Sequence, residues 1–481
     1  MTEDATRATR RGLSAFAGLI LLSASGALAA DVVNDVTGLN PVPVARIVVP
    51  HSVAEVSRLV GEHEGPIGIG GARHSQGGQI AADGCLFLDM RAMNHVLVFD
   101  PQARRITVEA GITWRAIQEV IDPRGLSVKV MQTYSNFTVG GSLSVNAHGR
   151  YVGEGALVES VVSFDIVLAD GTVVTATRTQ NREIFDGAIG GYGGLGVIVA
   201  ATLDLVPNGA IERVVRHMPV GQYRDYFLTQ VRNAPQAVLH NADLYPPHYR
   251  HVTSVTWLAT EEKVTVPERL MPRHKATSRD RLLLGWLSDG PFGKEIREYL
   301  YEPAQLAGRS VEWRNYEASY DAAMLEPDSR ERRTFGLQEY FVPIAHFDAF
   351  VARMAATLRA AQANVLNVSI RHASPDRETI LTWAPQEMFS FVIYFEQGTG
   401  PQERAAVRRW TGEVIEAALA EGGTYYLPYQ IVATPAQFLR AYPGASQFFA
   451  LRQRLDPKCK FRNRLWERYD TAPACAAATG R

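Results

Sequence analysis

Cysteine is scarce in this sequence. Cys85, Cys459 and Cys475 are the three cysteines among 481 residues, and their separations match neither a metal-ligand pattern nor a disulfide framework. The sequence therefore predicts no metal site. Two alternatives stay open for the thiols: either Cys459 pairs with Cys475 after export, or the cysteines remain unpaired.

An excess of charge of one sign is also missing. The 49 basic and 50 acidic residues leave a formal net charge of -1, whereas nucleic acids and anionic membrane surfaces usually attract a basic excess. No internal repeat and no low-complexity stretch is present. Hydrophobic residues make up 46% and charged residues 21% of the chain, which is typical of a globular protein of two or three domains. We therefore expect no nucleic-acid partner.

The amino terminus differs from the rest of the chain. Arg7, Arg10 and Arg11 precede an uncharged stretch, 12–30, that ends in small residues, and this order is typical of a secretory signal peptide. The alternative is a membrane anchor, but serine and glycine leave the apolar run short of the ~20 residues that a span needs. Residues 9–13 also suit a twin-arginine signal, without its usual lysine. We expect residues 1–30 to be removed and the protein to be exported to the bacterial periplasm or beyond, with membrane attachment only if the signal is retained.

The pattern of predicted elements along the chain changes at Pro207. Before it, short β-rich runs alternate with helical stretches and glycine turns, and after it the segments are longer and contain fewer glycines. We divide the chain into 31–207, 208–424 and a closing segment, 425–481, that returns to the first part. The fold class predicted is α+β, with an antiparallel sheet flanked by helices in the second part.

Individual elements follow from periodicity and end signals. Ser52 is the expected N-cap of a helix over 52–63, and proline and glycine end a helix over 113–125. Asp170-Gly171 predicts a hairpin turn. Further helices are expected at 347–363 and 410–423, and strands at 45–50, 85–90, 105–111, 159–174, 338–343 and 365–373.

Three glycine-rich segments stand in the first part of the chain, at 67–79, 138–150 and 187–206, and the first two contain a histidine. Glycine lets backbone N–H groups approach a ligand closely and form concave anion sites. The alternative is that they are only tight turns. The third segment also satisfies G-x-G-x-x-G, but a helix precedes it and a strand follows. Because a nicotinamide site needs the reverse order, we exclude that site.

The order of these parts resembles the FAD domain of the vanillyl-alcohol-oxidase superfamily, which has the two-part PCMH-type fold. The matching motifs are GARHS after a helix, then TVGGSLS, then GGYGGLGVI before a strand. The resemblance implies FAD, with its pyrophosphate at the first loop and its ring bonded covalently to His74. The alternative for His74 is a hydrogen-bonding residue beside a non-covalent FAD. No cysteine is close to Tyr134, where some relatives have a second tether, so a single tether is expected.

The resemblance also gives a set of cofactor contacts. His148 is assigned to the flavin rather than to catalysis. The full set is Gly70, Gly71, Ala72, Arg73, His74, Ser75, Gln79, Thr138, Gly140, Gly141, Ser142, Ser144, His148, Gly149, Gly193, Gly194, Gly196, Val197 and Ile198.

Two branches of the superfamily resemble the second part. LQEYFVP (337–343) and NVSIRHA (367–373) are similar to strands of the sugar-alcohol and aldonolactone oxidases, although Ser369 stands where that branch has glutamate and its lysine motif is absent. YLPYQ (426–430) resembles a motif of cytokinin dehydrogenases, but Thr133 replaces the aspartate that their amine substrate needs.

We therefore expect an FAD enzyme that oxidises a C–OH group of a sugar, polyol or lactone, with oxygen, a quinone or a cytochrome as electron acceptor. Cytokinin-like amine oxidation and a flavin-carrying electron-transfer protein are the alternatives. Substrate contacts are expected from Arg371, Tyr429 and Gln430, supported by Glu339 and His372. The alternative for Glu339 and Arg371 is an ion pair between neighbouring strands, and for Tyr429 it is aromatic packing.

Overall fold

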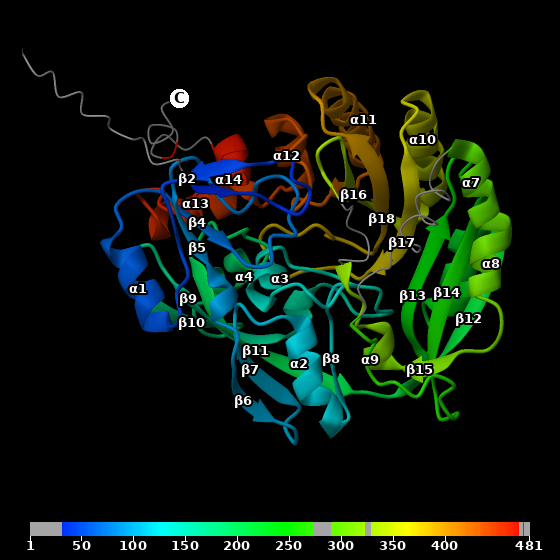
Figure 1. The fold of residues 1–481 in the computed structure, drawn as a ribbon, viewed down its shortest axis with the longest axis horizontal. Coiled ribbons are helices and arrows are strands. Elements are labelled where there is room, and N and C mark those ends of the chain that lie inside the picture. Colours follow the sequence, from blue (N-terminus) through cyan, green and yellow to red (C-terminus); the bar gives the residue numbers. More distant parts are fainter. Residues whose placement is uncertain (1–30, 274–289, 323–328, 471–474, 476–481) are drawn as a thin grey trace, which may run out of the picture.

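The computed structural model describes residues 31–273, 290–322, 329–470 and 475 (Figure 1). The predicted signal peptide, 1–30, lies outside the described residues. Within the described part, none of the helices is both long enough and apolar enough to cross a membrane.

The first sheet is small and parallel. Its order is β3-β5-β4, and helix α1 connects two of its strands. The Ser52 side chain accepts a hydrogen bond from the Glu55 N–H, which confirms the predicted N-cap. A separate hairpin, β1-β2, precedes this sheet. The bounds are β1 Asp31–Val33, β2 Val42–Val44, β3 Arg46–Val48, α1 Val53–Glu62, β4 Ile67–Gly70 and β5 Leu86–Asp89.

The second sheet is antiparallel, in the order β10-β9-β11-β7-β6, with β8 paired to β11. The Asp170-Gly171 turn joins β9 to β10, and Gly171 there has a φ of 86° that favours glycine. Helix α2 ends in a 3-10 turn closed by Gly125, as the sequence predicted. The bounds are β6 Val96–Asp100, β7 Arg105–Glu109, α2 Trp114–Ile121, β8 Leu126–Val128, β9 Val161–Val167, β10 Val173–Thr177, α4 Arg182–Ala188 and β11 Val197–Pro207.

The third sheet has eight strands in the order β15-β12-β14-β13-β17-β18-β16-β19. Helices α10 and α11 pack on one face, at the upper right of Figure 1. Helix α11 begins at Pro401, earlier than predicted, because Gly400 is the N-cap and proline suits the first turn. The bounds are β12 Ala210–Pro219, β13 Ala237–Leu244, β14 His251–Thr260, β15 Val311–Trp313, β16 Arg333–Pro343, α10 Phe347–Ala360, β17 Val365–Ala373, β18 Met388–Gly398, α11 Pro401–Ala420 and β19 Thr424–Tyr425.

Short helices complete the second part, and the overall class is α+β, as predicted. Two of them continue as π-helical turns, η4 after α5 and η5 after α7. Their bounds are α5 Val220–Tyr226, η4 Phe227–Val231, α7 Gly290–Ile296, η5 Arg297–Tyr301, α8 Glu302–Gln305 and α9 Arg314–Glu317.

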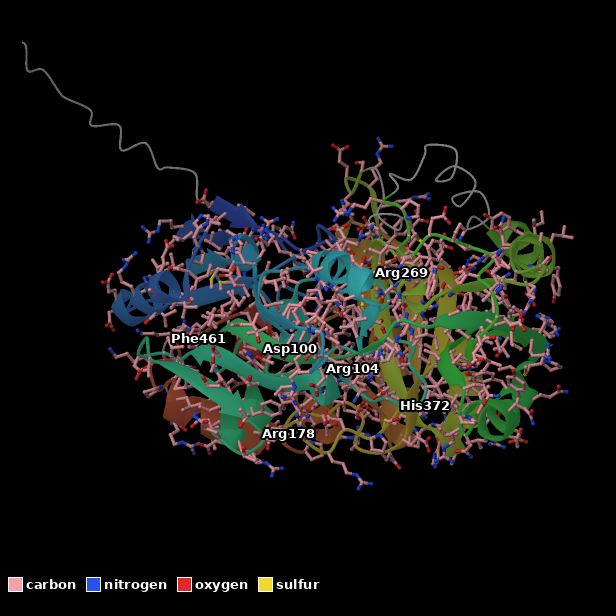
Figure 2. The ribbon with its side chains drawn as sticks, turned by 90° about the horizontal axis from the view of Figure 1, so that it is seen from below. Asp100, Arg104, Arg178, Arg269, His372 and Phe461 are labelled. Atoms are coloured by element: carbon pink, nitrogen blue, oxygen red, sulfur yellow. A yellow bond between two sulfur atoms is a disulfide. The ribbon has the colours of Figure 1, made fainter. Side chains whose placement is uncertain are left out.

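The closing segment packs against the amino-terminal sheets, in red beside β4 in Figure 1. Phe461 forms a parallel bridge with Ile67, the first residue of β4. In Figure 2, Phe461 lies on the side of the molecule that carries the amino-terminal sheets, and His372 lies toward the opposite side. A disulfide joins Cys459 and Cys475, so the paired alternative holds in the structure, whereas Cys85 is free and buried. The helices are α12 Pro435–Ala441, α13 Ala445–Leu455 and α14 Arg464–Tyr469.

One glycine segment differs from its expected form. Residues Val139–Ser144 of the second segment are a short helix, α3, rather than a loop. Gly140 explains the location of the helix, since its N–H donates to the Ala110 carbonyl and a Cβ there would lie 2.9 Å from the Ala110 Cβ. The chain therefore packs against β7 through backbone, which a larger residue would prevent.

Candidate active site

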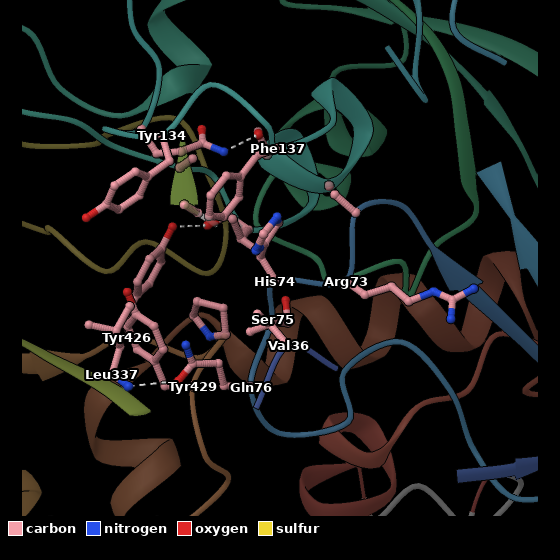
Figure 3. A pocket seen from close by; sticks show the side chains of 18 of the residues that line it. Val36, Arg73, His74, Ser75, Gln76, Tyr134, Phe137, Leu337, Tyr426 and Tyr429 are labelled. Carbon is pink, nitrogen blue, oxygen red and sulfur yellow. Dashed lines mark hydrogen bonds between the residues drawn. The ribbon is translucent and has the colours of Figure 1, made fainter. Parts of the chain in front are cut away.

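A cavity of about 710 Å³ lies where the three parts of the chain meet (Figure 3). This volume is within the range of pockets that hold cofactors and small ligands. Many of the predicted cofactor residues line it: Gly71, Ala72, Arg73, His74, Ser75, Gln79, Thr138, Gly140, Gly141, Ser142, Ser144, His148, Gly193, Gly196 and Ile198. Of the predicted catalytic residues, Glu339, Arg371 and Tyr429 also line it.

Close backbone packing forms one wall of the cavity. A Cβ on Gly71 would lie 2.1 Å from the Thr138 Oγ1, so the first glycine segment can meet the start of α3 only as glycine. Arg73 follows with a φ of 61°, and its guanidinium pairs with Asp89 at 2.7 Å. This left-handed turn leads directly into His74.

His74 lies beside an aromatic ring at the cavity. Its imidazole stacks on Phe137 with ring centroids 4.0 Å apart and an interplanar angle of 21°. Figure 3 shows the two rings next to each other, with Tyr134 nearby. Phe137 directly precedes Thr138, the N-cap of α3, so the start of this helix positions the ring that stacks on the imidazole.

The closing segment holds the first glycine segment in place. The Gln79 side chain donates from Nε2 to the carbonyls of Leu427 and Tyr429, each at 2.7 Å. The Gln76 side chain accepts from the Leu337 N–H at 2.8 Å, the contact drawn in Figure 3. These contacts hold the YLPYQ motif (426–430) against both the first glycine segment and the large sheet.

Buried polar groups form a cluster on the large sheet. The Nε2 of His148 lies 2.6 Å from Oε1 of Glu339, and both side chains are buried. The Tyr429 hydroxyl donates to Oε2 of Glu339 at 3.2 Å, and the Ser390 hydroxyl donates to Oε1 at 2.5 Å. This cluster connects the second glycine segment with the substrate-side residues.

The surroundings shift two pKa values in opposite directions. Burial alone would raise the pKa of Glu339, but His148 and Arg371 outweigh it and hold that pKa below its ordinary value. Burial, reinforced by the Glu339 charge, raises the pKa of Tyr429 well above its ordinary value. At neutral pH, Glu339 is therefore a carboxylate and Tyr429 a neutral hydroxyl donor.

Arg371 shares the cavity with Glu339, but they are not on neighbouring strands. Strand β18 separates β16 from β17, and the register pairs Glu339 with Val392 and Val392 with Ser369. In the part of the chain that the structure describes, no ion pair joins Glu339 to Arg371, and the Arg371 Nε is buried without a hydrogen-bond partner. The alternative of a neighbouring-strand ion pair is therefore wrong.

His372 was wrongly predicted to support the substrate side. Successive strand residues point to opposite faces, so His372 is on the reverse of the face that carries Arg371. Its Nε2 lies 2.8 Å from Oε1 of Glu387 and its ring packs near Phe227.

Gln430 also lies outside the cavity lining, since its amide donates to the Gln76 carbonyl. Four predicted cofactor residues lie outside the cavity lining and are tightly packed. Gly70 leaves space for the Phe87 ring, and Gly194 leaves space for the Trp466 indole. A Cβ on Gly149 would clash with the Met131 carbonyl. Val197 is buried in a hydrophobic core. Side-chain direction and close packing, which motif matching ignores, decide these cases.

Several lining residues were missed by the sequence analysis. Alternation from Glu339 and Arg371 would have identified Leu337, Asn367 and Ser369 on the same face. No sequence signal pointed to the charged end of the cavity, where Arg297 and Glu302 come from the π-helical turn η5 and the start of α8. The missed lining residues include Gln132, Phe137, Tyr192, Arg297, Glu302, Leu337, Asn367, Tyr394, Glu396 and Tyr426.

Comparison with known proteins identifies the first part of the chain. Residues 44–177 match the family model described as FAD binding domain. The chain carries a PCMH-type FAD-binding domain. This match confirms the FAD domain that the motifs predicted.

Curated relatives span both substrate branches. The chain is similar to L-gulonolactone oxidase of Mus musculus, 33% identical over 156 residues that make up 32% of this chain and 35% of the relative. Cytokinin dehydrogenase 2 of Arabidopsis thaliana is 29% identical over 40% of each chain. Alditol oxidase of Streptomyces sp. is 26% identical over 76% of this chain and 80% of the relative. The chain thus spans about two fifths or less of the length of the first two of these relatives.

The cavity of this FAD-linked protein fits the cofactor. Gly71 and Gly140 let backbone segments pack closely at the cavity, and backbone-rich segments of this kind suit a pyrophosphate. The hydroxyl of Thr133 and the Nδ1 of His148 are buried without hydrogen-bond partners at the lining, so both remain available to a bound group. The residues that would hold FAD are those of the first glycine segment (67–79), of helix α3 and of the turn around Gly193.

Proposed function

We propose that the protein oxidises a C–OH group of a sugar, polyol or aldonolactone with FAD as cofactor. The observation that carries the proposal is the cluster of Glu339, His148 and Tyr429 facing the same cavity as Arg371. The printed names of the gulonolactone and alditol oxidase relatives support this substrate class. Bound FAD supplies the redox chemistry by accepting a hydride from the substrate carbon.

The side chains of the sheet have distinct roles in this proposal. The Arg371 guanidinium, with its Nε unpartnered, donates to the substrate oxygen and stabilises the negative charge that develops when the proton leaves. Tyr429 stays protonated and orients the reacting hydroxyl. The Glu339–His148 pair accepts the proton, since a buried carboxylate and imidazole 2.6 Å apart can share one.

The cofactor attachment is also part of the proposal. His74 would bond covalently to the flavin ring, and its rigid stacking on Phe137 supports this role because it fixes the imidazole at the cavity. Oxygen, a quinone or a cytochrome would then reoxidise the flavin. Export to the periplasm or beyond is supported by the Cys459–Cys475 disulfide, since disulfides persist in oxidising compartments.

Amine oxidation of the cytokinin type is the second candidate, favoured by the similarity to cytokinin dehydrogenase 2. It needs an acidic group for the amine nitrogen, and Thr133 lines the cavity at the expected position. A threonine hydroxyl offers no negative charge there, so the C–OH substrate remains the better supported proposal.

An anaerobic substrate panel tests the proposal. Purified protein would be mixed without oxygen with alditols, aldoses, aldonolactones and isoprenoid adenines, and the yellow absorbance of the flavin followed. Bleaching by a polyhydroxylated compound is the expected result. Bleaching by the adenines alone would establish amine oxidation of the cytokinin type. If no organic donor bleaches the flavin but a redox protein reduces it, the protein is an electron carrier.

A further inference from the structure

We infer that His217, His251 and Glu298 bind a divalent first-row transition metal ion of the zinc type, at a site separate from the cavity. The two histidines come from adjacent strands and the glutamate from the π-helical turn η5, and their ligand atoms all lie within 4.8 Å of one another. Two imidazoles and one carboxylate are a common protein ligand set for Zn²⁺.

Strand geometry brings the histidines together. In the β12–β14 register, His217 lies opposite Thr253 and His251 lies opposite Pro219, so the histidines are diagonal neighbours on one face. Their rings are stacked with centroids 5.3 Å apart. Two positive imidazolium groups would repel at this distance, so the arrangement favours neutral rings, the form that binds metals.

Glu298 supplies a buried carboxylate to the pair. It is 3% exposed, and its Oε1 lies 3.1 Å from the Nδ1 of His251. A buried carboxylate is costly unless a cation or several donors compensate it. A metal ion at this position would supply that compensation. To bind it, the three ligand atoms would need to move only slightly closer together.

The surroundings hold the first histidine in a suitable orientation. The Thr253 hydroxyl lies 3.1 Å from the Nδ1 of His217, and a hydrogen bond of this kind typically fixes the ring of a metal-binding histidine. His217 is exposed, so an ion can enter from solvent.

The proposed site also connects to the cavity. Glu298 directly follows Arg297, which lines the cavity and donates to the carboxylate of Glu302 at 2.5 Å. A metal ion bound by the three residues would tie η5 to β12 and β14 and so fix the charged end of the cavity. π-Helical turns are frequent at functional sites, which agrees with this location.

Equilibrium dialysis of the untagged, flavin-loaded protein against Zn²⁺ tests the inference. We expect one Zn²⁺ per chain, and His217→Ala and His251→Ala should each weaken binding by more than about tenfold. Mg²⁺ and Ca²⁺, which prefer oxygen ligands, should not compete. His217 is exposed, so its replacement should leave the fold intact, and the flavin absorbance checks this.

The matched control is His248, whose Nε2 lies 3.2 Å from Oε1 of Glu295 in an exposed pair. This pair offers only two ligands, so His248→Ala should bind Zn²⁺ as the wild type does. The inference is overturned if the wild type binds no Zn²⁺, or if His217→Ala binds it as tightly as the wild type. Zinc lost in His248→Ala but kept in His217→Ala would show adventitious surface binding and would also overturn it.

Discussion

The Nε2 of His148 and the Oε1 of Glu339, 2.6 Å apart, join the FAD-binding part of the chain to the large antiparallel sheet. Both side chains are buried, and the contact connects the segment after α3 with the middle of β16. This hydrogen-bonded pair is therefore one of the contacts that position the cofactor segments relative to the substrate-side residues, and its protonation also bears on the proposed chemistry.

Glu339→Gln tests the role of this pair. The amide keeps the size and hydrogen-bonding ability of the carboxylate but cannot accept the substrate proton, so kcat should fall by about 10²–10⁴-fold. Stopped-flow measurement of flavin reduction by a substrate from the panel is the readout. Unchanged reduction in Glu339→Gln would show that the pair is structural only.

Arg371→Lys should separate charge from geometry. The lysine keeps the positive charge but loses the planar fork of donors, so kcat should fall by about 10²–10³-fold while the flavin content stays unchanged. Flavin content is measured from the absorbance of the purified protein. Loss of flavin in this variant would move Arg371 from the substrate to the cofactor.

His74→Ala tests the covalent attachment. Wild-type protein that is denatured and washed should remain yellow, and His74→Ala should release its flavin under the same treatment because the nucleophilic ring nitrogen is gone. Phe137→Leu, which removes the stacked ring but keeps His74, is the control and should retain the colour. Complete release of flavin from the wild type would leave His74 as a non-covalent contact.

Gly71→Val should destabilise the protein and weaken FAD binding. Its Cβ would lie 2.1 Å from the Thr138 Oγ1, and overpacking of this kind costs about 1–3 kcal/mol of unfolding free energy. Gly209→Ala, where no heavy atom lies within 4 Å of the added Cβ, is the matched control. Thermal unfolding with and without added FAD measures both effects, and equal melting temperatures for the two variants would contradict the close packing at Gly71.

Asp243→Asn should change the pH dependence of stability. Burial, with a further contribution from Glu302, raises the pKa of Asp243 from 3.8 to about 6, and its carboxylate accepts from Asn367 at 2.7 Å. Because the folded state holds this proton more tightly, the unfolding free energy of the wild type should fall relative to Asp243→Asn as the pH rises from about 4 to 6, and stay level above. Denaturant titrations across this range check the difference, and an unfolding free energy of the wild type that falls relative to Asp243→Asn toward low pH would mean that the pKa is lowered.

Local rules predicted much of the fold. Ser52 began a helix and Gly125 ended one because capping depends on neighbouring residues alone. Motif matching located the glycine segments at the cavity but could not show that Gly194 and Val197 lie outside its lining, since it takes no account of which positions face the cavity. His372 was a correctable error, because alternation along β17 already sets it opposite to Arg371.

The remaining site residues depend on distant pairing that no local pattern encodes. His217 on strand β12 and Glu298 on the turn η5 come close only because η5 packs against the large sheet that contains β12. The charged end of the cavity likewise requires η5 to contact β17, where Arg297 donates to the Leu366 carbonyl at 2.5 Å. Register and tertiary packing, rather than composition, decide these contacts.

The bridge between Ile67 and Phe461 covers an otherwise open sheet edge. Strand β4 is the outer strand of the parallel sheet, and the Ile67 N–H donates to the Lys460 carbonyl while the Ile67 carbonyl accepts from the Arg462 N–H. An uncovered outer strand presents unpaired N–H and C=O groups that can pair with another molecule. A variant that lacks the residues from Lys460 onward should therefore self-associate through β4, which light scattering would detect.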